Sequence, residues 1–196
     1  MKQGDNMYEK LIKKYIPVNG QEQIDQKAML SFIEHNKDCL DRTNLSGHFT
    51  SSAIIVNESM DQVLFAYHNI YDSWSWVGGH NDGESNFLEV ALKEAKEETG
   101  INNVYPYDSE IMMLDILPVK RHVKRGQFVG HHLHFNLTFL LIANTSDELS
   151  IKPDENSGVK WFKIDEVLDY VSEEDMKEVY KKGFDYINKC KNQIHN

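Results

Sequence analysis

Three glutamates at close spacing carry the clearest chemical signal in the sequence. Glu94, Glu97 and Glu98 fall within a stretch that reads as a helix of about four turns, from Asn86 to Gly100. On such a helix the three carboxylates project into roughly one third of the circumference, where like charges repel. A hard divalent cation that takes oxygen ligands removes this repulsion. The spacing therefore predicts a magnesium or manganese site, and a solvated glutamate-rich helix face is the alternative for these residues taken alone.

Both ends of this helix are specified by its own residues. Asn86 can act as N-cap with Glu89 three residues further on, and Gly100 suits the left-handed conformation that often ends a helix. One arc of the helix is expected to pack against the core, and it comprises Leu88, Leu92, Ala95 and Thr99. The carboxylates are expected to lie between this arc and a solvated one.

The residues around the carboxylates favour the metal site over the solvated face. Gly78 and Gly79 precede the helix and let the backbone come close to a ligand, so the carbonyl of Gly78 can reach a metal. Lys93 stands one turn before Glu97 and can hold that carboxylate in a fixed rotamer.

The stretch from Gly79 to Ile101 resembles the signature of the Nudix hydrolases, in which a glycine is followed at a fixed gap by Arg-Glu, then by Glu-Glu, one residue and a glycine. The matching residues at the family's spacing are Gly79, Lys93, Glu94, Glu97, Glu98, Gly100 and Ile101. Lys93 replaces the usual arginine, which keeps the charge but loses the bidentate fork. Ser85 stands where the family has an earlier glutamate, with Glu84 one place before it.

This resemblance implies an α/β fold, namely an α/β/α sandwich with a mixed sheet. It also implies hydrolysis of a diphosphate (pyrophosphate) linkage in a nucleoside diphosphate linked to another group, with Mg²⁺ or Mn²⁺ as cofactor. In this mapping the metal ligands are Glu94, Glu97, Glu98 and the carbonyl of Gly78, and Lys93 orients Glu97. The signature does not set the general base. Glu155, in the loop before Trp161, is the first candidate and Glu84 the second.

Two other functions remain open. A nucleotide-binding regulator could keep the fold and do no chemistry, although none of the three carboxylates is lost. The isomerase branch of the fold, which acts on isoprenoid diphosphates, would need a catalytic cysteine, and neither Cys39 nor Cys190 has a convincing strand context.

Composition bounds the classes of partner. A chain of 196 residues with 40% hydrophobic content can bury one core, perhaps with a small appendage. The net charge of −10 disfavours binding to a nucleic acid or an anionic membrane, so a small phosphate-bearing substrate must be met by metal and local cations. With two cysteines and neither a signal peptide nor a long apolar run, a reducing cytoplasm is expected. Monomer and homodimer both stay open.

The periodicity of the chain predicts an N-terminal helical extension over 1–46 and a Nudix hydrolase domain over 47–196. The extension reads as two amphipathic helices, the second capped by Asn19, which either pack against the core or serve as a substrate lid or dimer contact. The elements expected after it are strands at 52–56, 62–68, 74–77, within 105–118, at 131–142 and at 160–162, a basic loop at 120–125, a short helix at 165–171 and a C-terminal helix capped by Ser172.

The strongest strand carries a polar row opposite an apolar face. The row comprises His132, His134, Asn136 and Thr138. Such a row inside a helix-covered sheet is costly unless it borders a wet cleft. His132 and His134, with Cβ atoms about 7 Å apart, could address two phosphate or sugar oxygens, or could be satisfied at a sheet edge. A zinc site made with His131 is disfavoured because His131 points to the other face.

Two residues near the glycines complete the predicted substrate-binding set. These are Trp76, whose ring could stack on a nucleobase or pack in the core, and His80.

Overall fold

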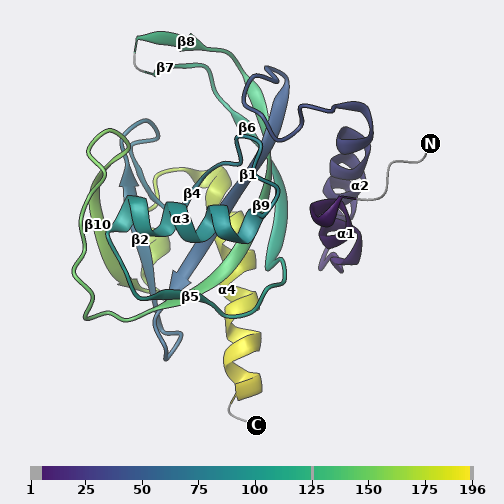
Figure 1. The fold of residues 1–196 in the computed structure, drawn as a ribbon. Coiled ribbons are helices and arrows are strands. Elements are labelled where there is room, and N and C mark those ends of the chain that lie inside the picture. The colour runs from purple at the N-terminus through teal and green to yellow at the C-terminus, as the bar shows by residue number, and fades with distance from the viewer. Residues whose placement is uncertain (1–5, 125, 195–196) are drawn as a thin grey trace.

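The computed structural model describes residues 6–124 and 126–194, which form a curved sheet with helices on both sides (Figure 1). The helices are α1 (Met7–Lys14), α2 (Gly20–His35), α3 (Phe87–Thr99), the 3₁₀ turn η1 (Val167–Tyr170) and α4 (Glu174–Ile194). The strands are β1 (Gly47–Val56), β2 (Gln62–His68), β3 (Ser73–Ser75), β4 (Val77–His80), β5 (Val104–Pro106), β6 (Met113–Val119), β7 (His122–Lys124), β8 (Gln127–Val129), β9 (His132–Ala143) and β10 (Asn156–Lys163).

The sheet is mixed, as the sequence predicted. β1 and β9 run parallel at its centre, in register from Gly47 beside Leu133 to Val56 beside Ile142. The strand order is β10-β2-β1-β9-β5, and β3, β4 and β6 pair with β2, β1 and β9 in antiparallel orientation. β1 begins at Gly47 rather than at residue 52, because β9 offers it a pairing partner along its whole length.

Two apolar clusters lie on opposite faces of the sheet. One contains side chains from α1, α2 and α3, among them Ile12, Met29 and Ala91. The other contains the buried stripe of α4, among them Tyr180 and Ile187. Residues that alternate along β1 and β9 enter the two clusters in turn, as the period of a strand requires. The architecture is therefore the predicted α/β/α sandwich.

The N-terminal helices pack against the core. Asn19 accepts a hydrogen bond from the amide of Glu22, which confirms the predicted cap of α2. The ring of Phe32 stacks on Phe135 of β9 with centroids 4.1 Å apart, and Tyr8 of α1 lies 5.7 Å from Phe87 of α3. Packing is thus the confirmed alternative for these helices, while the domain boundary at residue 47 stays a prediction.

A buried ion cluster ties α2 to α4 and β6. The Nζ of Lys182 lies 2.9 Å from Glu22 Oε1 and 2.6 Å from Asp115 Oδ1. Both carboxylates are almost fully buried, and burial raises the pKa of Asp115 to about 6 against the opposing effect of Lys182. These ion pairs therefore link α2, near the start of the chain, to α4, near its end.

Two further local predictions were wrong, and a third, the short helix before α4, was right in kind but too long. The segment expected as a basic loop at 120–125 belongs to a hairpin, β7 and β8, that projects beyond the sheet (Figure 1), with Arg125 outside the described residues. The short helix expected at 165–171 is the 3₁₀ turn η1. Ser172 is not the N-cap of α4, because the helix begins at Glu174 and is preceded by Glu173; the hydroxyl of Ser172 donates to the carbonyl of Asp72. Each was decided by contacts distant in sequence or by a turn too short for periodicity to resolve.

Among the described residues, no helix has both the length and the apolar content needed to cross a bilayer.

Candidate active site

The helix that carries the glutamates begins and ends where its sequence predicted. The side chain of Asn86 accepts a hydrogen bond from the amide of Glu89. Gly100 has a φ of 76°, a left-handed conformation that glycine adopts at no steric cost, and its amide donates to the carbonyl of Lys96. Local interactions therefore set where α3 begins and ends and, with it, the angular spacing of its carboxylates around the helix.

The face that α3 buries differs from the one predicted. Ala95 and Thr99 of the expected arc are fully buried, but Leu88 and Leu92 are only partly so, and Phe87 and Ala91 are buried in their place. This rotation places two of the glutamates on the inner side of the helix. Glu94 and Glu98 are 9% and 4% exposed, while the side chain of Glu97 is 41% exposed. The three carboxylates thus do not share one environment.

Two glycines of β4 make room for the inner carboxylates. The amide of Gly78 donates to Glu98 Oε1 at 2.9 Å. A Cβ atom on Gly79 would lie 2.5 Å from Glu94 Cδ, a separation that no real Cβ contact shows. The predicted role of the Gly78 carbonyl as a metal ligand stays a prediction, since the structure assigns a hydrogen bond to its amide.

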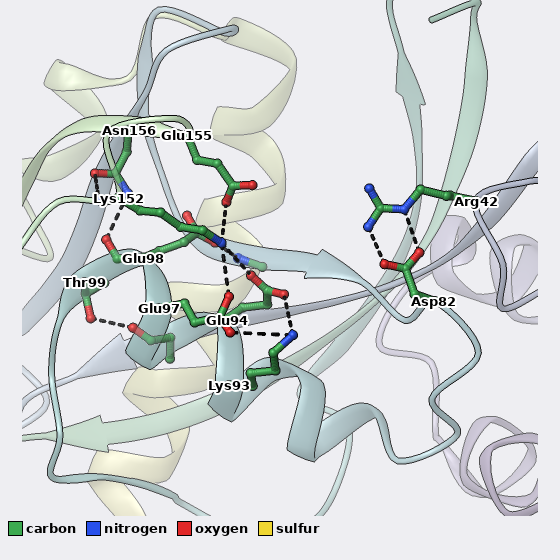
Figure 2. Close-up of polar contacts among 12 residues, drawn as sticks. Arg42, Asp82, Lys93, Glu94, Glu97, Glu98, Thr99, Lys152, Glu155 and Asn156 are labelled. Carbon is green, nitrogen blue, oxygen red and sulfur yellow. Dashed lines mark hydrogen bonds and ion pairs between the residues drawn. The ribbon is translucent and has the colours of Figure 1, made fainter. Parts of the chain in front are cut away.

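The loop before β10 brings a further carboxylate to α3. One oxygen each of Glu94, Glu98 and Glu155 lie within 4.8 Å of one another (Figure 2). The side-chain amide of Asn156 donates to the main-chain carbonyl of Glu98 at 2.9 Å, which fixes this loop against the end of the helix. Glu155 was chosen from sequence as a candidate base, and it does lie beside the helix glutamates.

A lysine that sequence reasoning missed lies among these carboxylates. Lys152 Nζ is 3.0 Å from Glu155, 3.1 Å from Glu97 and 3.9 Å from Glu94 (Figure 2). Only its i,i+3 spacing to Glu155 could have suggested the first of these contacts. Lys93 lies 3.6 Å from Glu97, so the pair predicted from their i,i+4 spacing is present.

Burial gives the carboxylates opposite electrostatic properties. Burial raises the pKa of Glu94, and it raises the pKa of Glu98 from 4.5 to about 8. The hydrogen bond from Lys152 lowers the pKa of the more exposed Glu97. Two ionised carboxylates side by side in a buried position are costly unless a cation accompanies them. Three features fit a hard divalent cation with oxygen ligands. They are the carboxylate oxygens themselves, the space beside Gly79 that Glu94 occupies and a Cβ atom would fill, and the ammonium of Lys152, which lies among the carboxylates.

The loop between β4 and α3 is fixed by an ion pair with the segment between α2 and β1. The guanidinium of Arg42 donates through Nε and Nη2 to both carboxylate oxygens of Asp82, apart from the glutamate cluster (Figure 2). Glu84, the second candidate for the base, is exposed, and its carboxylate accepts from the amide of Asn86. The contact between Arg42 and Asp82, forty positions apart, could not be inferred from spacing along the chain.

Four histidines form a second cluster at one end of the sheet. His48 is the second residue of β1, His80 ends β4, and His132 and His134 are the first and third residues of β9, with one ring nitrogen of each within 4.8 Å of the others. Sequence reasoning predicted substrate contact for three of them but assigned no role to His48, which the parallel register places directly beside His134. His131 precedes β9 and is exposed.

The rest of the polar row is dry. Asn136 and Thr138 are 1% and 0% exposed, so the expected wet cleft does not border them. The hydroxyls of Thr50 and Ser52 on β1 both donate to Asn136 Oδ1, at 2.9 and 2.8 Å, and Asn136 donates to Thr138. A matching polar row on the neighbouring strand therefore satisfies these groups without water.

Trp76 packs against α4 and not among the glutamates or the histidines. Its ring meets Tyr180 of α4 edge-on at 5.3 Å, within the apolar layer on that side of the sheet. Its predicted contact with substrate, like those of His80, His132 and His134, stays a prediction.

The site thus combines acidic groups from one helix and one loop, which converge beside a glycine pair in a mixed sheet between helices. The family model described as NUDIX domain matches residues 47–183, and the chain belongs to the Nudix family. Membership of this family implies that the protein hydrolyses phosphoanhydride bonds.

Solved structures agree on the fold. The chain is similar to the MutT protein from Methanosarcina mazei Go1, with 17% identity, a TM-score of 0.55 and coverage of 74% of this chain and 98% of that one. It is similar to a Nudix hydrolase from M. smegmatis, with 13% identity, a TM-score of 0.52 and coverage of 76% and 88%. It is also similar to an Ap4A hydrolase from C. elegans, with 16% identity, a TM-score of 0.50 and coverage of 68% and 93%. No curated protein matches the sequence.

Proposed function

We propose that the protein is a metal-dependent hydrolase that cleaves the diphosphate linkage of a nucleoside diphosphate joined to another group, with Mg²⁺ or Mn²⁺ as cofactor. The observation that carries the proposal is the convergence of Glu94, Glu98 and Glu155, with oxygens within 4.8 Å of one another. Glu97, at the edge of the same cluster, completes the acidic set. The net charge of −10 makes such a metal necessary for a polyanionic substrate to approach.

Glu94 and Glu98 would hold the divalent cation, with Glu97 reaching it from the exposed side. Bound there, the cation would lower the pKa of a coordinated water and neutralise charge on the diphosphate. The amide of Gly78 orients Glu98, and Lys93 orients Glu97. These contacts restrict the carboxylate rotamers before any ligand arrives.

Glu155 is our candidate for the base that takes the proton of the attacking water. It approaches the helix glutamates from a separate loop, and its Oε2 is held 3.0 Å from Lys152 Nζ. The ammonium of Lys152 is also the nearest positive group for a substrate phosphate that displaces it from the carboxylates.

Activity should be sought with magnesium on nucleotide sugars, dinucleoside polyphosphates, ADP-ribose and damaged nucleoside triphosphates. We expect hydrolysis of at least one class, and loss of that activity in Glu97→Gln and in chelator, because an amide leaves a neutral oxygen where the cation needs charge. Glu89→Gln, on the exposed side of the same helix, is the matched control and should keep wild-type rates. Glu155→Gln should lower kcat with little change in KM.

Two results would contradict the proposal. One is full activity of Glu97→Gln or of the chelated protein, which would remove the metal. The other is tight binding of these nucleotides without turnover, which would favour the non-catalytic regulator.

A further inference from the structure

The four histidines meet at the ends of three strands that are far apart in sequence. The ring of His48 lies 4.9 Å from that of His80, 5.0 Å from His132 and 5.1 Å from His134, measured between centroids. His134 lies 5.0 Å from His80 and 4.9 Å from His132. Each imidazole therefore has at least two others as neighbours, and none of the glutamates belongs to this group.

His48 presents a buried nitrogen with nothing to bind. Its Nδ1 lies 3.2 Å from the carbonyl of Asn44. Because a carbonyl only accepts, Nδ1 carries the proton and Nε2 holds a lone pair. His48 is 3% exposed, and within the described residues its Nε2 has no hydrogen-bond partner. A desolvated lone pair aimed at three other imidazoles is costly unless a ligand fills the space.

His132 is oriented in the same way. Its Nδ1 lies 3.0 Å from the carbonyl of Gly130, so its Nε2 also holds a lone pair. With that lone pair His132 accepts a hydrogen bond from the Nε2 of His134, 3.1 Å away, in the place where a shared ion would lie between the two rings. Two imidazole ligands of one tetrahedral zinc ion, each about 2.05 Å from it, have nitrogens about 3.3 Å apart. The spacing of this pair already suits a shared ion.

The donor type selects the ion. Four imidazoles suit Zn²⁺ and its neighbours in the first transition row, whereas Mg²⁺ prefers oxygen. Backbone carbonyls that fix the Nδ1 proton are the usual outer partners of histidine metal ligands, and His48 and His132 both have one. The cluster therefore differs in chemistry from the carboxylates of α3 and loop 150–155.

We infer that His48, His80, His132 and His134 form a second metal site, which binds one zinc ion per chain and is separate from the catalytic carboxylates. The ion joins the starts of the parallel strands β1 and β9 to the end of β4, two residues beyond Gly78. The ion thus restrains the end of β4, the strand that carries Gly78 and Gly79, and the base of the hairpin formed by β7 and β8. This inference goes beyond the proposed hydrolysis and does not depend on it.

The test is zinc binding by the full chain, stripped with chelator and then saturated with magnesium so that the carboxylates are occupied. Calorimetric titration should give one zinc ion per chain. His132→Ala, at a half-buried position, should weaken that affinity by more than about 100-fold, the upper end of what loss of an outer partner costs. His131→Ala is the matched control and should bind as wild type, as should Glu98→Gln.

X-ray absorption on the wild-type zinc form keeps the inference testable if a histidine variant fails to fold. A shell of imidazole nitrogens at about 2.0–2.1 Å is expected. A shell of carboxylate oxygens overturns the assignment, as does zinc binding that survives His132→Ala but is lost in Glu98→Gln. Absence of zinc binding together with a raised KM in His132→Ala also overturns it, and would return these imidazoles to substrate contact.

Discussion

Replacing Glu98 by glutamine should stabilise the metal-free protein at alkaline pH. Glu98 is 4% exposed, and burial raises its pKa from 4.5 to about 8. Glutamine keeps the shape and can still accept the hydrogen bond from Gly78, but it carries no charge to desolvate. The variant therefore removes one electrostatic cost and leaves the local contacts in place.

The sign follows from the raised pKa. A carboxyl whose pKa is higher in the folded than in the unfolded protein favours the protonated form in the folded state. Its contribution to the free energy of unfolding is therefore fully present below pH 4.5 and is lost as the pH rises to about 8. At about 1.4 kcal/mol per unit, the full displacement corresponds to about 5 kcal/mol, and most of it, about 4 kcal/mol, falls between about pH 5 and pH 9. Glu98→Gln should not suffer this loss.

The assay is denaturant unfolding of both proteins in chelator across that pH range. Titration of groups that do not interact with Glu98 cancels in the difference between wild type and variant. Saturating magnesium should reduce the difference at high pH, because the ion stabilises the ionised wild-type carboxylate. Glu97→Gln is the matched control: its pKa is lowered by the hydrogen bond from Lys152, so the variant should lose a little stability at neutral pH, less than about 1 kcal/mol for so exposed a group. A difference between wild type and Glu98→Gln that stays flat with pH would refute the reasoning.

Two further substitutions follow from close contacts. Gly79→Ala should push Glu94 aside and lower kcat on the order of 100-fold, while circular dichroism shows that the fold persists. Gly130→Ala is the control and should be neutral, because the space around its Cβ atom is open. Equal rates in the two variants would show that Glu94 does not need the space beside Gly79. Lys182→Met should destabilise the protein by about 3–5 kcal/mol in denaturant unfolding, because it leaves two buried carboxylates without their cation, and a loss below about 1 kcal/mol would show that water or rearrangement replaces the ion pairs.

The sequence by itself determined the features that depend on neighbours along the chain. The caps of α3 at Asn86 and Gly100, the pair of Lys93 with Glu97, and the alternation of β9 all follow from spacings of a few residues. The family signature lies in the same short stretch, so the fold class and the reaction class could be predicted with it.

Tertiary structure decided which side of α3 faces the sheet. The three glutamates share one third of the helix in sequence, but the position of β4 buries Glu94 and Glu98 and leaves Glu97 exposed. Lys152 enters the cluster from a separate loop, which Asn156 fastens to the end of the helix. No periodicity within either segment encodes how the two segments are placed relative to each other.

The histidine cluster shows the same limit. The polar row of β9 was visible as a period of two, but its partner row on β1 was not, because parallel pairing joins residues more than eighty positions apart. That register satisfies Asn136 from Thr50 and places His48 beside His134. Local sequence thus determined which residues share a face of one strand, whereas the long-range register determined which faces meet and what chemistry they can form together.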